Sequence, residues 1–111
     1  FNLYYRKEIP SPDYVIKNLL KITTLLHEKL PNTKLYLQTL LPTARDFINQ
    51  SIDIVNASIK VHQSDETYTL IDLNPHFTAD DGLINTSLTY DGTHLNSQGY
   101  LLWSELIMKY L

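Results

Sequence analysis

Two short apolar segments, separated by one amphipathic segment, constrain the fold of this chain more than any other feature of its sequence. Residues 34–41 and 67–73 are rich in apolar and β-forming side chains, which is typical of buried strands. The apolar residues of 46–62 recur at three- and four-residue steps, which predicts a helix with one buried face. A strand, a helix and a second strand in this order form a right-handed crossover, so the two strands should be parallel. The buried face of the helix is expected to comprise Phe47, Ile48, Ile52, Val55 and Ile59.

A second helix is predicted before this unit. Ser11 can cap free backbone amides, Pro12 suits the first helical position, and Asp13 complements the positive end of the helix dipole. Apolar residues continue at helical spacing to about Leu30, and Pro31 ends the helix.

A third helix is predicted at the C-terminal end of the sequence, where Asn96 or Ser97 should cap it. Gly99 falls in its first turn, although glycine has a poor helical propensity. We therefore expect the helix to approach a neighbouring loop or strand closely at this glycine. The order helix, strand, helix, strand, helix predicts a three-layer α/β fold with parallel strands. The buried stripe of the third helix is expected to comprise Leu102, Trp103, Leu106, Ile107 and Tyr110.

The overall composition argues against several classes of function. The chain has 111 residues, of which 43% are hydrophobic, so it can form one small globular domain. Its net charge of −3 and its lack of a basic patch argue against a nucleic-acid partner. Because the chain has no cysteine, it forms no disulfide and no thiolate metal site, and its composition does not indicate an oxidising or a reducing compartment. The sequence contains no run of about 18 apolar residues, so no membrane span is predicted. Asp80 and Asp81 are not followed by alternating oxygen ligands, so we expect no metal site there.

An acid that precedes a histidine by three residues is the strongest candidate for catalytic chemistry. Asp91 and His94 lie in a glycine-containing loop that leads into the last predicted helix. Asp91 can accept a hydrogen bond from one ring nitrogen of His94, which leaves the other nitrogen free to act as a base. The alternative is a common Asp-Gly turn followed by a surface histidine. His76 is a weaker candidate because it lacks both the preceding acid and the following helix.

The segment after the first predicted strand is a candidate for the rim of a binding site. In open parallel sheets, ligands bind outside the carboxyl ends of the strands. Thr43 and Arg45 follow residues 34–41 closely, and both are candidate substrate-binding residues. Arg45 could attract an acidic substrate such as a carboxylated sugar. Alternatively, its charge is solvated in the loop or pairs with Asp46 at the start of the next helix.

A longer pattern surrounds the Asp–His pair. Residues 91–96 read Asp-Gly-Thr-His-Leu-Asn, and Gly99 and Tyr100 follow at the head of an amphipathic helix. This block closely resembles the last block of the SGNH (GDSL-like) esterases and acylhydrolases. The resemblance implies a flavodoxin-like, three-layer α/β fold and a Ser-His-Asp triad to which Asp91 and His94 would contribute. It implies no metal and no organic cofactor.

The other catalytic motifs of that family have no counterpart in this sequence. The family's nucleophile lies in a Gly-Asp-Ser motif, and its oxyanion hole uses a glycine from a second block and an asparagine from a Gly-x-Asn-Asp block. None of these motifs occurs here, and Asn2 is followed by Leu3 where aspartate would be expected. We therefore expect residues 1–111 to be the C-terminal portion of a single SGNH-like domain. It should be inactive alone and should need a missing N-terminal half, a second polypeptide or self-association.

For the parent protein, the resemblance implies hydrolysis of small acyl esters, with O-acetyl groups on carbohydrate as one substrate class. Two other interpretations remain open. One is a non-catalytic carbohydrate-binding or interaction module on the same fold, whose function would survive substitution of Asp91 or His94. The other is a complete small α/β protein without an enzymatic role, which would be a stable monomer of 12.9 kDa.

Overall fold

Two parallel strands form the centre of the molecule. The computed structural model describes residues 11–64 and 67–111, so Asn2 lies outside the described residues. In both strands the three paired residues are in register, with Tyr36 opposite Thr69 and Gln38 opposite Ile71, which confirms the predicted parallel pairing. The elements in chain order are α1 (Pro12–Lys29), β1 (Tyr36–Gln38), α2 (Asp46–Val61), β2 (Thr69–Ile71), α3 (Asn74–Phe77), a 3-10 turn η1 (Thr86–Leu88) and α4 (Ser97–Met108).

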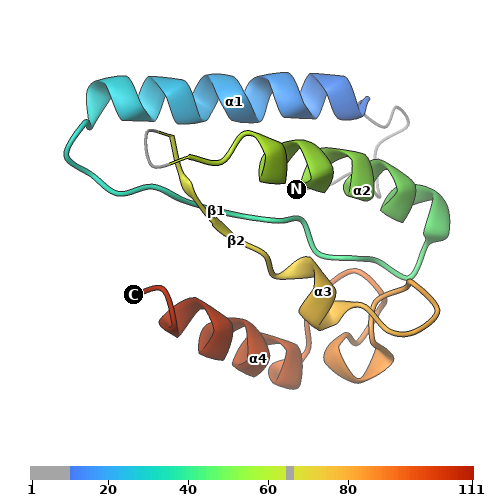
Figure 1. Ribbon diagram of the computed structural model, residues 1–111. Coiled ribbons are helices and arrows are strands. Elements are labelled where there is room, and N and C mark those ends of the chain that lie inside the picture. The colour runs from blue at the N-terminus through green and yellow to red at the C-terminus, as the bar shows by residue number, and fades with distance from the viewer. Residues whose placement is uncertain (1–10, 65–66) are drawn as a thin grey trace.

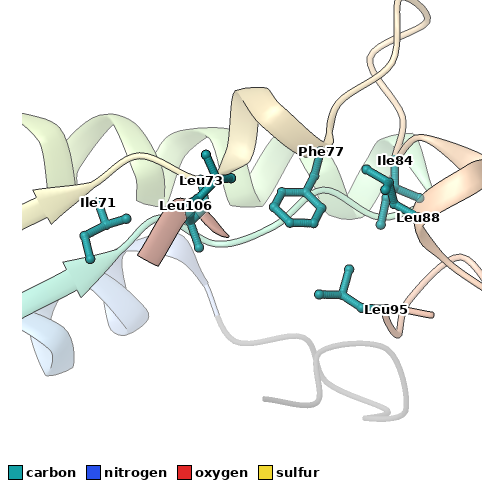
Figure 2. Close-up of a cluster of buried hydrophobic side chains, with 7 residues drawn as sticks. All are labelled: Ile71, Leu73, Phe77, Ile84, Leu88, Leu95 and Leu106. Atoms are coloured by element: carbon teal, nitrogen blue, oxygen red, sulfur yellow. The ribbon is translucent and has the colours of Figure 1, made fainter. Parts of the chain in front are cut away.

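Helices cover both faces of this small sheet. Helices α1 and α2 lie together on one side of the strands and α4 lies on the other, so the predicted three-layer α/β arrangement is confirmed (Figure 1). Two apolar clusters fill the spaces between the layers. The cluster beneath α1 and α2 is built around Val15, Val55, Ile59 and Tyr68. The cluster on the α4 side comprises Ile71, Leu73, Phe77, Ile84, Leu88, Leu95 and Leu106, and Figure 2 shows the ring of Phe77 in its midst.

The first helix follows its sequence signals closely. The Ser11 hydroxyl accepts a hydrogen bond from Tyr14 N at 3.2 Å, and Pro12 occupies the first helical position. Although α1 is 18 residues long, no helix in the described part of the chain is both long and apolar enough to cross a membrane.

The buried face of α2 differs from the predicted one at a single position. Ile48, Ile52, Val55 and Ile59 are buried as predicted, but Phe47 is 55% exposed. Phe47 precedes Ile48 by one residue and therefore points about 100° away from it around the helix axis. Two asparagines, Asn49 and Asn56, complete the buried face instead, so the prediction for Phe47 was wrong.

Both strands are shorter than the predicted segments 34–41 and 67–73. Beyond Gln38, the backbone of Leu40 is bonded to the Asn56 side chain rather than to a strand, which ends regular pairing. Beyond Ile71, the chain soon enters the single helical turn α3, which ends the second strand.

The last helix begins as predicted. The Asn96 side chain accepts a hydrogen bond from Gly99 N at 2.9 Å and so caps α4. Gly99 packs directly against the carbonyl oxygen of Leu88, and a Cβ at this position would also meet Leu95 at 3.0 Å. The predicted close approach at Gly99 is therefore confirmed. Of the predicted stripe, Leu106 is buried and Tyr110 lies beyond the helix, where it is 41% exposed.

Candidate functional site

Asp91 and His94 form a hydrogen-bonded pair in the loop before α4. Asp91 Oδ2 lies 2.7 Å from His94 Nδ1. The other carboxylate oxygen, Oδ1, accepts from His94 N at 2.7 Å and from Thr93 N at 2.8 Å. An ionised carboxylate can only accept hydrogen bonds, so Nδ1 must carry the ring proton and Nε2 has the free electron pair in the neutral ring. The expected orientation of the histidine by Asp91 is therefore present.

The same contacts lower the pKa of the Asp91 carboxyl group. The hydrogen bond from His94 N lowers the pKa of the Asp91 carboxyl most, followed by the contact with the His94 ring and the hydrogen bond from Thr93 N. Together they bring this pKa from 3.8 to about 2. A carboxylate that stays ionised at neutral pH can hold the Nδ1–H proton and stabilise a charged imidazole ring.

The His94 side chain is open to solvent on its outer side. It is 51% exposed, and Nε2 has no hydrogen-bond partner within residues 11–64 and 67–111. The ring of Tyr90 stacks on it with the ring centroids 6.0 Å apart and an angle of 16° between the planes. Tyr90 could not be singled out from the sequence, because its ring contact depends on the conformation of the loop. Of the four histidines in the chain, His94 is the one with a hydrogen bond to a described carboxylate.

Glycine at position 92 allows the loop to pack against Ala44, in the segment between β1 and α2. Gly92 has a φ of +87°, a conformation that other residues rarely adopt. Its carbonyl accepts a hydrogen bond from Ala44 N at 2.9 Å, and a Cβ at Gly92 would meet the Ala44 Cβ at 2.7 Å. Thr89 fastens the loop internally, because its hydroxyl donates to His94 O and accepts from Gly92 N. The Asp–His pair is thus held at the carboxyl end of the sheet, where ligands bind in α/β folds.

The two predicted rim residues flank the contact between Ala44 and Gly92, but they differ in exposure. Thr43 is buried, and its hydroxyl is already bonded to the Asn49 side chain and to the Arg45 backbone. Arg45 is exposed and precedes the first residue of α2. Both residues are therefore near the Asp91–His94 loop, and substrate contact by either of them stays a prediction.

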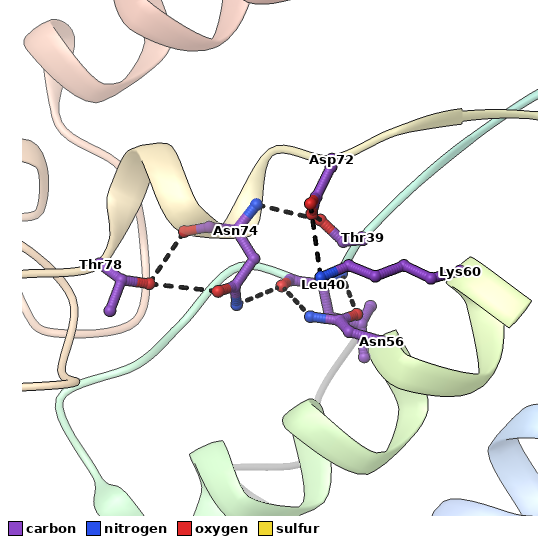
Figure 3. A network of polar contacts seen from close by, with 7 residues as sticks. All are labelled: Thr39, Leu40, Asn56, Lys60, Asp72, Asn74 and Thr78. Carbon is purple, nitrogen blue, oxygen red and sulfur yellow. Dashed lines mark hydrogen bonds and ion pairs between the residues drawn. The ribbon is translucent and has the colours of Figure 1, made fainter.

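A separate polar network fixes the segment between β1 and α3 (Figure 3). Asn74 donates from Nδ2 to Leu40 O at 2.9 Å and from its backbone to the Thr39 hydroxyl at 3.0 Å. Asp72 accepts a hydrogen bond from the Thr39 hydroxyl and pairs with Lys60 Nζ at 3.4 Å. These groups are bonded to one another, and their arrangement indicates a structural role at the strand ends.

The described residues contain no group of three or more histidine, cysteine, aspartate or glutamate side chains that could hold a metal ion. Asp81 instead closes its own turn, because its carboxylate accepts from Leu83 N at 2.9 Å.

Comparisons with known proteins identify the fold. No protein-family model and no curated protein sequence matches this chain. Among solved structures, it is similar to a protein described as a candidate acylhydrolase from Bacteroides fragilis, with 24% identity and a TM-score of 0.78 over 94% of this chain and 53% of that chain. A GDSL-like lipase from Bacteroides thetaiotaomicron matches with 21% identity and a TM-score of 0.81 over 97% of this chain and 56% of that chain. A candidate platelet activating factor from Streptococcus pneumoniae matches with 21% identity and a TM-score of 0.78 over 89% of this chain and 51% of that chain. The chain thus spans about half the length of the solved structures that it matches and shares their fold over that half.

Proposed function

We propose that this chain, which has part of the SGNH (GDSL-like) hydrolase fold, supplies the acid and the base of a serine esterase triad. The proposal depends chiefly on one observation, the 2.7 Å contact between Asp91 Oδ2 and His94 Nδ1 in the loop that packs against Ala44. This contact orients a histidine whose Nε2 is exposed and free to exchange a proton with a reacting group.

The proposed reaction is hydrolysis of an acyl ester in two steps. His94 Nε2 takes the proton of a serine hydroxyl as its oxygen attacks the ester carbonyl, and it then returns the proton to the leaving alcohol. Water attacks the resulting acyl-enzyme with His94 again as the base, which releases the acid and restores the serine. Asp91 holds Nδ1–H and stabilises the imidazole ring while it is charged.

The serine is proposed to come from outside this chain. No Gly-Asp-Ser motif occurs in the sequence, and the chain spans 51–56% of the solved structures that it matches. We infer that residues 1–111 are the C-terminal portion of a single SGNH-like domain, to be completed by an N-terminal half, a second polypeptide or another copy. Loss of the nucleophile from a triad costs on the order of a millionfold in turnover, so the chain alone should be inactive.

The proposed substrates are small acyl esters, with O-acetyl groups on carbohydrate as the leading class. The descriptions of the similar proteins as acylhydrolase and GDSL-like lipase support an ester substrate in general. Arg45, exposed beside the segment that contacts the Asp91–His94 loop, would favour an acidic alcohol portion.

Labelling with a fluorophosphonate followed by intact mass spectrometry tests the proposal. We expect the purified chain of 12.9 kDa to remain unlabelled and a serine on a separate or longer polypeptide to react when that polypeptide is present. The Asp91→Asn and His94→Ala variants should suppress this labelling, because the serine would lose its base. Label on a serine of the 12.9 kDa chain itself, or labelling that is insensitive to both variants, would contradict the proposal.

A further inference from the structure

Asn49 is a buried polar side chain to which the proposed reaction assigns no role. It lies near the start of α2 and is 5% exposed. Its carboxamide meets the backbone of Thr43 at two points, because Oδ1 accepts from Thr43 N at 2.7 Å and Nδ2 donates to Thr43 O at 2.8 Å. Oδ1 also accepts from the Thr43 hydroxyl at 2.9 Å, and Nδ2 also donates to Gly82 O at 3.3 Å. Both polar atoms of this side chain are therefore fully used.

The segment at residues 43 and 44, which Asn49 holds in place, packs against the loop that contains Asp91 and His94. Ala44 follows Thr43 directly, and its N–H donates to Gly92 O at 2.9 Å. The Ala44 Cβ leaves room for a glycine at position 92 but for no larger residue. A displacement of the backbone at 43 and 44 would therefore move Gly92, which lies between Asp91 and His94 in the sequence.

We propose that Asn49 is a positioning residue for the Asp91–His94 pair and acts through Thr43, Ala44 and Gly92 without touching the reacting atoms. Its catalytic meaning rests on the proposed function. A buried network whose members are all satisfied is rigid, because any movement breaks hydrogen bonds that water cannot replace. By holding the backbone of Thr43, Asn49 thus keeps Ala44 in place for its contact with Gly92 in the exposed loop.

Asn56 provides a matched control within the same helix. It lies two helical turns after Asn49 on the same face and is equally 5% exposed. Its side chain also bonds a backbone unit from both sides, with Oδ1 accepting from Leu40 N at 2.8 Å and Nδ2 donating to Leu40 O at 2.9 Å. Leu40 has no hydrogen bond to the 89–96 loop, so Asn56 shares the chemistry of Asn49 but not its connection to the candidate site.

The test compares Asn49→Ala with Asn56→Ala by the ring tautomer of His94, measured from the ¹⁵N chemical shifts of the neutral ring in the purified protein. A free imidazole favours the proton on Nε2, whereas the bond to Asp91 requires it on Nδ1. We expect the wild-type protein and Asn56→Ala to keep the Nδ1–H form. In Asn49→Ala, the His94 ring should instead be a mixture of the Nδ1–H and Nε2–H tautomers. Urea unfolding of both variants should reveal a loss of stability, which should be larger for Asn49→Ala because that side chain makes four hydrogen bonds whereas Asn56 makes two.

Two results would overturn the proposal. One is an unchanged His94 tautomer in folded Asn49→Ala, and the other is an equal loss in Asn56→Ala. If Asn49→Ala fails to fold, the milder pair Asn49→Ser and Asn56→Ser is compared in the same way. Failure of both Asn49 variants to fold, with the Asn56 variants folded, would assign Asn49 a purely structural role. The tautomer is measured without serine or substrate, so a negative labelling experiment would remove the esterase proposal and leave this one standing.

Discussion

At the scale of single residues, the hydrogen bonds around Asp91 decide which form of its carboxyl group the folded loop prefers. Because the folded pKa is lowered from 3.8 to about 2, the loop favours the ionised form. This stabilisation is fully present above pH 3.8 and is lost as the pH falls through about 2. A ¹³C NMR titration of the Asp91 carboxyl carbon should therefore have its midpoint near pH 2.

The His94→Ala variant is the control for this titration. It keeps the backbone donors of residues 93 and 94 but removes the ring, so the midpoint should move only part of the way back toward 3.8. A wild-type midpoint at 3.8 would contradict the geometry of the loop.

The sequence predicts a residue's role best when its partners are close in the chain. The Asp91–His94 contact could be predicted because it spans three residues and needs only a suitable turn. The role of Asn49 could not, since its partners Thr43 and Gly82 are brought together by tertiary packing. One signal was available, because Asn49 and Asn56 fall on the same helical face as Ile52, and polar side chains on an apolar face are usually hydrogen-bonded.

At the scale of elements, the close contact between α4 and the turn before it favours glycine at position 99. Alanine is favoured over glycine in a helix by about 1 kcal/mol. A Cβ at position 99 would nevertheless press into Leu88 O, which also accepts from Asn96 N, and into the Leu95 side chain. Overpacking of this kind typically costs about 1–3 kcal/mol. We expect Gly99→Ala to lower the free energy of unfolding, as measured by urea denaturation, in spite of the better propensity.

The Gly82→Ala variant is the control for this substitution. Gly82 has a φ of +82° but open space around its Cβ position, so the substitution strains the backbone without a clash. Its cost should be about 1–2 kcal/mol, and the α4 backbone amide shifts should stay unchanged. An increase in stability for Gly99→Ala would refute the close packing at the helix start.

Helices were easier to predict than strands for a physical reason. The caps at Ser11 and Asn96 are local, and the structure uses both as expected. The first strand ends early because the Asn56 and Asn74 side chains bond the backbone of Leu40, which no pattern of apolar residues reveals.

At the scale of the whole molecule, the two buried clusters carry the stability of the fold. Phe77 is 0% exposed at the centre of the α4-side cluster, whereas Phe47 on α2 is 55% exposed (Figure 2). Phe77→Ala should cost about 3–5 kcal/mol. The matched change Phe47→Ala should cost less than about 0.5 kcal/mol in the isolated chain. Thermal and urea unfolding of the two variants measure this difference, and similar losses would contradict the burial of Phe77.

The apolar side chains exposed on the helices lead us to expect that the isolated chain associates with other copies of itself. Large apolar side chains remain exposed on α1, α2 and α4, and burial of such side chains against another molecule is favourable. We expect the isolated chain to self-associate as its concentration rises, which sedimentation velocity can detect. A monomer of 12.9 kDa at every concentration would favour a complete small α/β protein instead. The exposed residues include Ile22 and Leu25 on α1, Phe47, Ile54 and Val61 on α2, and Leu101 and Met108 on α4.

The loop at 91–94 also bears on the chemical ageing of the protein. An Asp-Gly sequence is prone to isomerise through a cyclic imide, in which the glycine nitrogen attacks the neutral carboxyl group and expels water. Here the Gly92 N–H is held by the Thr89 hydroxyl, and the lowered pKa keeps the Asp91 carboxyl ionised. The contacts that orient the histidine therefore also protect its partner from conversion to isoaspartate. During long storage, such damage at Asp91 should accumulate in unfolded molecules well before it reaches folded ones.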